Sequence, residues 1–204
     1  HVNIHTRHCL TCRNKIKANH KRRRAACRNV WDEWRKQNKC IECSKDPTHV
    51  HNYLVIEADH LPEFNKVERC SAMEYWVTKS RGIPALLAEL KKCQPLCRFH
   101  HALQTQQRRH SKGHVVKQAS ILKRRAVINK EKHKRGCCKL CERVLKEGEE
   151  CAFHFDHRDP TTKFIRNGKV ICPSHFAKLP QALFDTQWPL EQAKCDLLCA
   201  NCDK

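Results

Sequence analysis

The feature that most constrains this chain is a cysteine pattern that occurs twice. Residues 88–103 read AELKKCQPLCRFHHAL, and residues 191–204 read EQAKCDLLCANCDK. Both stretches contain Glu-x-x-Lys-Cys, then a Leu-Cys pair, then a further metal-competent residue three positions beyond that cysteine. A pattern repeated about a hundred residues apart predicts an internal duplication of a small module.

Each stretch completes a larger set of thiols and imidazoles. Every set opens with a Cys-x-x-Cys pair, whose sulfurs are poor disulfide partners but hold a tetrahedral cation well. The matched sets therefore predict two structural Zn²⁺ ions, one in each repeat, which supply much of the folding free energy of such small modules. The predicted ligands are Cys40, Cys43, Cys97 and His100 in the first repeat, and Cys138, Cys141, Cys199 and Cys202 in the second.

The abundance of these side chains also bears on the compartment. The chain has 16 Cys and 15 His, arranged mostly in Cys-x-x-Cys and Cys-x-x-His pairs, and it shows no signal-peptide pattern. Zinc is therefore favoured over a secreted disulfide framework. We expect a reducing intracellular compartment, nuclear or organellar (mitochondrial) rather than secreted.

An Asp-His pair lies at a matched distance after each Cys-x-x-Cys. Asp59-His60 ends the segment NYLVIEADH, and Asp156-His157 ends CAFHFDH. Both segments are rich in β-branched or aromatic residues, which predicts strands. We expect a second strand near each Lys-Cys and a helix after the closing zinc ligands. Closing the zinc site would bring the next residue, His101 or Asp203, toward the strand pair.

This combination of Cys-x-x-Cys, Asp-His and a closing Cys-x-x-Cys/His resembles the HNH, or ββα-metal, endonuclease family. The resemblance covers about two thirds of the chain and implies an α+β fold of two tandem zinc-stapled HNH-like modules joined by basic helical segments. It implies that His60 and His157 are general bases for phosphodiester hydrolysis. It also implies one catalytic divalent cation per module, Mg²⁺ or Mn²⁺. Its ligands would be Asp59 and His101 in the first module, and Asp156 and Asp203 in the second.

The sequence departs from the family pattern at two places. Lys92 and Lys194 stand where the family usually has an asparagine, and a lysine cannot accept a hydrogen bond from the base histidine. Asp203 stands where the first repeat has a histidine, and it is followed by a single residue. These departures make the first module the better candidate for activity.

The charge of the chain points to a polyanionic partner. It carries 41 Lys and Arg against 21 Asp and Glu, a formal net charge of +20. This favours nucleic acid, DNA or structured RNA, bound through its phosphate backbone, and no apolar run is long enough to predict a membrane partner. The candidate contacts are Arg22, Arg23, Arg24, Lys92, Arg108, Arg109, Arg124, Arg125 and Lys194.

These patterns divide the chain into four segments. We expect a basic helical segment with a partial zinc knuckle at 1–35, the first module at 36–104, a basic helical linker at 105–135 and the second module at 136–204. Cys9 and Cys12 form half a knuckle, Cys27 is expected to be a buried thiol, and Trp31 and Trp34 are expected to pack a helix. A second group could form an extra zinc site, or else leave one histidine to line the Asp-His cleft: Cys151, His154, Cys172 and His175.

Two functions remain open at the level of sequence. One is a metal-dependent HNH-type endonuclease that cuts DNA or, less readily, RNA. The other is a catalytically silent HNH fold that binds RNA beside other proteins of a ribonucleoprotein, such as an organellar ribosome. The retained Asp59, His60 and His101 favour the first, and the two lysines and the short second repeat favour the second.

Overall fold

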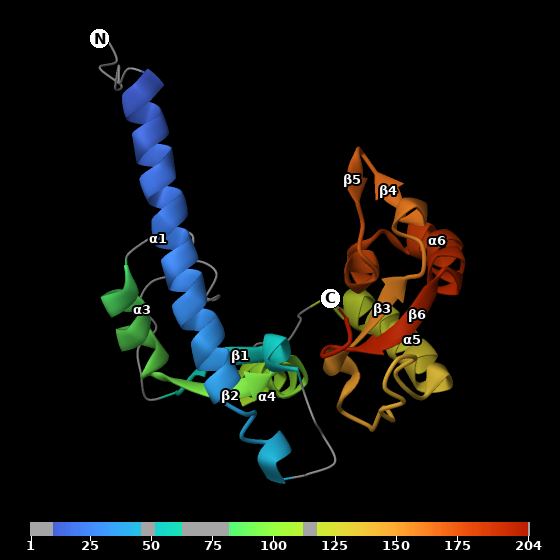
Figure 1. The fold of residues 1–204 in the computed structure, drawn as a ribbon. Coiled ribbons are helices and arrows are strands. Elements are labelled where there is room, and N and C mark those ends of the chain that lie inside the picture. The colour runs from blue at the N-terminus through green and yellow to red at the C-terminus, as the bar shows by residue number, and fades with distance from the viewer. Residues whose placement is uncertain (1–9, 46–51, 63–81, 112–117, 204) are drawn as a thin grey trace. The chain divides into compact units, whose positions relative to one another are not determined.

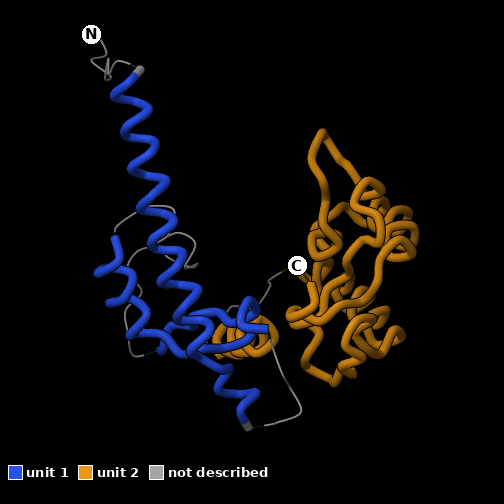
Figure 2. The backbone as a smooth tube through the Cα atoms, viewed as in Figure 1, with its two compact units in different colours: residues 1–97 blue, residues 98–204 orange. Residues whose placement is uncertain are grey.

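The computed structural model describes residues 10–45, 52–62, 82–111 and 118–203. The chain is a mixed α/β protein with three two-stranded sheets among these residues. It divides into two compact units, His1–Cys97 and Arg98–Lys204, each described below by itself (Figure 2). No helix in the described ranges is both long and apolar enough to cross a membrane.

The described residues of the first unit form two α-helices and one pair of antiparallel strands (Figure 1). Helix α1 spans Leu10–Gln37, α3 spans Ile83–Leu90, and the antiparallel strands β1 and β2 span Ile56–His60 and Cys93–Cys97. Two short 3-10 turns, η1 (Cys43–Lys45) and η2 (Tyr53–Val55), lie between α1 and β1. The two predicted strands of the first repeat are confirmed.

In the second unit, the residues that the structure describes form three α-helices and two pairs of antiparallel strands. Helices α4, α5 and α6 span Arg98–Ser111, Ala119–Arg135 and Gln181–Ala193. Strand β3 (Phe153–His157) pairs antiparallel with β6 (Cys195–Cys199), and β4 (Ile165–Arg166) pairs with β5 (Lys169–Val170). The 3-10 turns are η3 (Glu150–Ala152), η4 (Pro160–Thr162) and η5 (Pro173–Lys178). The strands predicted for the second repeat are confirmed as well.

The antiparallel strand pairs β1–β2 and β3–β6 have the same register. His60 is opposite Cys93 on β1 and β2, and His157 is opposite Cys195 on β3 and β6. The backbone bonds around them repeat too, since Ile41 N donates to Pro95 O (3.1 Å) in one copy and Lys139 N donates to Leu197 O (2.8 Å) in the other. Leu61 N to Lys92 O (3.0 Å) and Arg158 N to Lys194 O (3.1 Å) form a further equivalent pair. The sequence repeat is therefore also a structural repeat.

A helix ends three residues before each opening knuckle. Helix α1 ends at Gln37, ahead of Cys40, and α5 ends at Arg135, ahead of Cys138. The repeated element is thus longer than the cysteine pattern shows, because it includes the preceding helix. The four predicted segment boundaries remain a prediction, although the range predicted as a helical linker does contain the C-terminal half of α4 and all of α5.

The first unit is held by a small apolar cluster on α1 and α3. Cys27 and Trp31 are buried against Leu86 and Leu90, with Trp34 packed beside them. The rings of Trp31 and Trp34 stack with centroids 5.1 Å apart. The predictions that Cys27 is a buried thiol and that both tryptophans pack a helix are confirmed. Cys12 lies exposed on α1, and Cys9 lies outside the described residues.

Aromatic side chains fill the core of the second unit. Trp188 of α6 contacts Phe155, Phe176 and Phe184, with ring centroids 5.3, 5.6 and 6.1 Å away. Phe155 comes from β3 and Phe176 from η5, so this cluster packs α6 against strand β3 and turn η5. Burial of such large apolar side chains is the main stabilising term of a domain this small.

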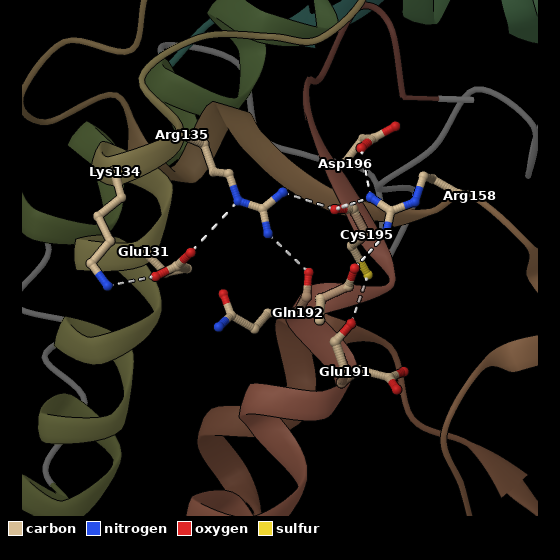
Figure 3. A network of polar contacts seen from close by, with 9 residues as sticks. Glu131, Lys134, Arg135, Arg158, Glu191, Gln192, Cys195 and Asp196 are labelled. Atoms are coloured by element: carbon tan, nitrogen blue, oxygen red, sulfur yellow. Dashed lines mark hydrogen bonds and ion pairs between the residues drawn. The ribbon is translucent and has the colours of Figure 1, made fainter.

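Two arginines hold the turn between α6 and β6 (Figure 3). Arg135 donates to the carbonyls of Cys195 and Gln192, both at 3.0 Å. Arg158 donates to the Cys195 carbonyl (3.3 Å) and to Oδ1 of Asp196 (3.0 Å). Arg158 also donates to the carbonyl of Ala193, so each arginine satisfies one of the last carbonyls of α6, which lack intrahelical partners, and also binds the first residues of β6.

Candidate metal centres and the adjoining pocket

The predicted zinc ligands of the first repeat lie together. Ligand atoms of Cys40, Cys43, Cys97 and His100 are all within 4.8 Å of one another. Cys43 Sγ and Cys97 Sγ are 3.7 Å apart, which is too far for a disulfide and close to the distance of about 3.8 Å between two sulfurs that bind one tetrahedral zinc ion. The donor set therefore fits a structural metal ion, with zinc the ion that thiolate and imidazole ligands favour.

The second repeat gathers four thiols in the same way. The sulfurs of Cys138, Cys141, Cys199 and Cys202 lie within 4.8 Å of one another, and Cys141 Sγ is 3.6 Å from Cys199 Sγ. Backbone bonds shape the closing knuckle, because Cys202 N and Asp203 N both donate to the Cys199 carbonyl at 2.9 Å. Both predicted clusters are thus present as groups able to hold a metal.

The thiols of the second cluster have divergent acidities. Burial raises the pKa of the Cys199 thiol to about 11, and burial also raises the pKa of Cys202, with hydrogen bonding from Cys141 adding to it. At Cys138 burial acts in the same direction, but backbone N–H donors outweigh it and lower the pKa to about 7. Several thiolates repel one another at this spacing, so a cation is what allows all of them to ionise.

The Asp-His pair of the first repeat is buried. Asp59 is 2% exposed, and its Oδ2 accepts a hydrogen bond from Nε2 of Gln94, the residue opposite it on β2, at 2.9 Å. His60 is 8% exposed. His101 lies half-buried on α4. In this repeat, a carboxylate predicted to bind a cation is therefore covered by a neighbouring amide.

The Asp-His pair of the second repeat lines a pocket of about 360 Å³ in the second unit. Asp156 is half-buried there, and the residue opposite it on β6 is Asp196, whose carboxylate is engaged by Arg158 at 3.0 Å. The pocket brings together the predicted general base of this repeat, His157, and both predicted cation ligands, Asp156 and Asp203, with basic and polar side chains around them. Its polar lining residues are Lys132, His154, Asp156, His157, Lys163, Cys172, Ser174 and Asp203.

Asp203 is tied to the strand by an imidazole. His154 Nδ1 lies 2.5 Å from Asp203 Oδ2, and this hydrogen bond lowers the pKa of the Asp203 carboxyl below its usual range. An ionised carboxylate at this position suits a divalent cation better than a neutral acid would. His154 lines the cleft, as one of the two sequence interpretations holds, and the described residues do not gather Cys151, His154, Cys172 and His175 into a metal cluster.

Each histidine predicted to be a general base contacts a glutamate that the sequence interpretation missed. His157 Nε2 lies 2.6 Å from Glu191 Oε1, and His60 Nε2 lies 2.6 Å from Glu89 Oε1. The other carboxylate oxygen of each glutamate accepts from the lysine three residues later, at 2.9 Å from Lys194 and 2.8 Å from Lys92. The repeated Glu-x-x-Lys-Cys motif therefore encodes a buried His–Glu–Lys network, and its recurrence was the signal for it.

This network fixes which nitrogen of the imidazole carries the proton. Burial opposes ionisation of Glu191, but the Phe164 backbone N–H, Lys194 and His157 together lower its pKa. A carboxylate can only accept hydrogen bonds, so Nε2 of His157 is the donor. In the neutral ring Nδ1 is then the acceptor, the state that a general base requires.

The basic residues predicted to contact phosphate fall into two groups. Lys92 and Lys194 are held by the buried glutamates, Arg108 donates to Gln104, and Arg124 is buried. The guanidinium of Arg124 donates to Ala177 O and Gln181 Oε1, both at 2.9 Å. Its role is therefore structural, and the prediction that Arg124 contacts phosphate is wrong. The exposed members are Arg22, Arg23, Arg24, Arg109 and Arg125.

No protein-family model, no curated protein and no solved structure matches the chain.

Proposed function

We propose that the protein is a metal-dependent endonuclease that hydrolyses phosphodiester bonds of nucleic acid at the pocket of the second unit. The observation that carries this proposal is that Asp156, His157 and Asp203 line one pocket together with Lys132 and Lys163. Two carboxylates, an imidazole and two ammonium groups are the side chains that cation-assisted phosphate hydrolysis uses.

Each side chain has a role in this proposal. Asp156 and Asp203 hold a divalent cation, Mg²⁺ or Mn²⁺, which when bound neutralises charge on the phosphate and the leaving oxygen. His157 accepts the proton of the attacking water at Nδ1, while Glu191 holds Nε2. Lys163 attracts the phosphate backbone into the pocket, while the ammonium of Lys132 donates to Glu150 O at 2.7 Å and lines the wall.

The choice of repeat differs from the sequence-based prediction. The sequence favours the first repeat, because it keeps a histidine after its last zinc ligand. Burial favours the second, because Asp59 is covered by Gln94 whereas Asp156 lines a pocket. A cation and a phosphate need access to the carboxylate, so we place hydrolysis at the second repeat.

The test compares cleavage of supercoiled plasmid DNA and of a structured RNA by the zinc-loaded protein, with Mg²⁺, Mn²⁺ or a chelator of these ions. His157→Ala is expected to lower the rate by about 10², a typical contribution of a general base. His60→Ala and His110→Ala serve as matched controls, the latter an exposed histidine of α4, and should keep the wild-type rate. If His60→Ala lowered the cleavage rate by about 10² and His157→Ala kept the wild-type rate, hydrolysis would be assigned to the first repeat instead.

A second function has one observation in its favour. The side chains of His157 and Glu191 are each only 2% exposed, and buried His–Glu–Lys networks can serve stability alone. A purely structural network would fit a catalytically silent subunit. Such a subunit would bind RNA in a ribonucleoprotein, for instance an organellar ribosome. Tight RNA binding without cleavage under any divalent cation would select it.

A further inference from the structure

Helix α1 is supported along only part of its length. Its C-terminal part carries Cys27 and Trp31, which are buried against α3. Of the residues from Thr11 to Asn29, every one except Cys27 is exposed. In Figure 1 the N-terminal half of α1 extends beyond α3 and beyond the strands β1 and β2 of its own unit. Residues 11–26, about four turns of helix, therefore present their full circumference to solvent.

The charge of this part of α1 is entirely of one sign. No acidic residue occurs between Thr11 and Trp31, and the first turn of α1 contains none either. One row of basic side chains runs along the helix at successive spacings of 4, 4, 3 and 4 residues, which keeps them on one face. The row covers about 22 Å at 1.5 Å per residue. Its members are Arg13, Lys17, Lys21, Arg24 and Arg28.

A second basic row follows another side of the same helix. Lys15 and Arg22 are seven residues apart and so lie one above the other, about 150° around the axis from the first row. Between the two rows, on the side away from the buried Cys27, the side chains are small or carry amides. These residues are Thr11, Asn14, Ala18, Ala25 and Asn29.

We propose that the exposed part of α1 docks in the major groove of double-stranded DNA, with its basic rows on the two phosphate walls and the face between them toward the base edges. The major groove of B-DNA is about 12 Å wide and admits an α-helix. The two walls of phosphates flank a helix in that groove, which matches two basic rows separated by a strip of small side chains. Asparagine amides are suited to adenine edges, and Ala and Thr methyl groups to thymine methyl groups.

The geometry favours DNA over duplex RNA. The major groove of A-form RNA is deep and narrow, and side chains of a helix do not reach its bases. A helix with small side chains on its leading face needs a wide groove. This docking role rests on the proposed nucleic-acid partner, but it does not depend on hydrolysis at the pocket.

The test measures binding of the zinc-loaded full chain to a labelled 20-base-pair DNA duplex and to the RNA duplex of the same sequence, over a range of salt concentrations. Lys17→Gln/Lys21→Gln/Arg24→Gln removes three charges from the first row. Lys123→Gln/Lys130→Gln/Lys178→Gln removes three exposed charges elsewhere and is the matched control. Each phosphate contact contributes about 0.9 to the log–log salt slope, so the first variant should lower the slope by about 2.7 and the control should leave it unchanged.

Far-UV circular dichroism and zinc content check that both variants are folded. Should the triple variant not fold, Lys21→Gln alone is expected to lower the slope by about 0.9. Equal slopes for the α1 variant and the control would overturn the proposal, as would RNA bound as tightly as DNA. Binding with these properties in a protein that cuts nothing supports the docking role while removing the proposed hydrolysis.

Discussion

His157 Nε2 lies 2.6 Å from Oε1 of Glu191, and the same contact joins His60 to Glu89 at the same distance in the other repeat. Each glutamate sits just before the strand whose last cysteine is a candidate metal ligand. The two halves therefore preserve a metal cluster and a buried ion network together. We expect both features to contribute to the stability of the repeat that contains them.

Breaking this network should destabilise the unit that contains it. Glu89→Ala removes the acceptor shared by the buried His60 and the partly exposed ammonium of Lys92, and a hydrogen bond to a charged group contributes about 1.5–3 kcal/mol. Urea unfolding of the zinc-loaded protein measures the loss. The exposed Glu147→Ala should change the unfolding free energy by no more than about 0.5 kcal/mol. A Glu89→Ala value as small as this control would show that the network contributes nothing to stability.

The stabilisation from Glu191 should depend on pH. Its folded-state pKa lies below the ordinary value of 4.5, so its contribution is fully present above that value and is lost as the pH falls through the folded-state pKa. The difference in unfolding free energy between wild type and Glu191→Gln should therefore be constant from neutral pH down to about 5 and shrink in more acidic solution. Protonation of the metal ligands affects both proteins alike and cancels in this difference. A difference that grows on acidification would give the opposite sign.

Metal analysis should find two zinc ions per chain. Cys40→Ser and Cys199→Ser each remove a ligand from one cluster, and metal binding in such sites supplies folding free energy on the order of 10 kcal/mol. Each variant should bind one zinc ion. The amide protons of the affected strand pair, β1–β2 for Cys40→Ser and β3–β6 for Cys199→Ser, should lose their protection from hydrogen exchange. The exposed Cys172→Ser is the control and should keep both ions. Fewer than one zinc ion per wild-type chain would contradict the assignment.

Loading the second cluster should release protons. The pKa of Cys199 is raised to about 11 and that of Cys202 is raised as well, so both thiols are protonated at pH 7 in the metal-free protein. Thiolates are the ligands of zinc, so binding should release at least about two protons from this cluster. Calorimetric titration in buffers of different ionisation enthalpy measures this number, and Cys202→Ser should reduce it. Binding without buffer dependence would show that the thiols are already ionised.

Repetition in the sequence predicted the parts of the fold that depend on local spacing. The strands ending in His60 and His157 and both ligand sets follow from patterns that recur. The covering of Asp59 by Gln94 could not be predicted, because it depends on which side chain stands opposite on the neighbouring strand. The burial of Arg124 was also hidden, since Arg125 directly beside it in the sequence is exposed and only the packing of η5 and α6 accounts for the difference.

The difference in accessibility between Asp59 and Asp156, on which the proposed choice of repeat depends, could not be predicted from the sequence for a related reason. The pocket beside Asp156 includes Lys163 and Ser174, which come from the segment between β3 and α6. That segment lies outside the repeated motif, so no comparison of the two copies could assign it a role. Tertiary placement of non-repeated residues thus decides accessibility, while the repeated residues decide the metal clusters.

The face of α1 between its basic rows should determine sequence preference without affecting salt dependence. Asn14 and Asn29 are exposed on that face, and an asparagine paired with adenine discriminates against other bases by about 1–3 kcal/mol. Asn14→Ala/Asn29→Ala should therefore flatten the distribution of DNA sequences selected from a random pool, while the salt slope stays at the wild-type value. Lys17→Gln should do the reverse, weakening binding to all sequences alike and lowering the slope by about 0.9. If the double asparagine variant selects the same sequences as wild type, α1 contacts phosphates only and the face between the rows does not read bases.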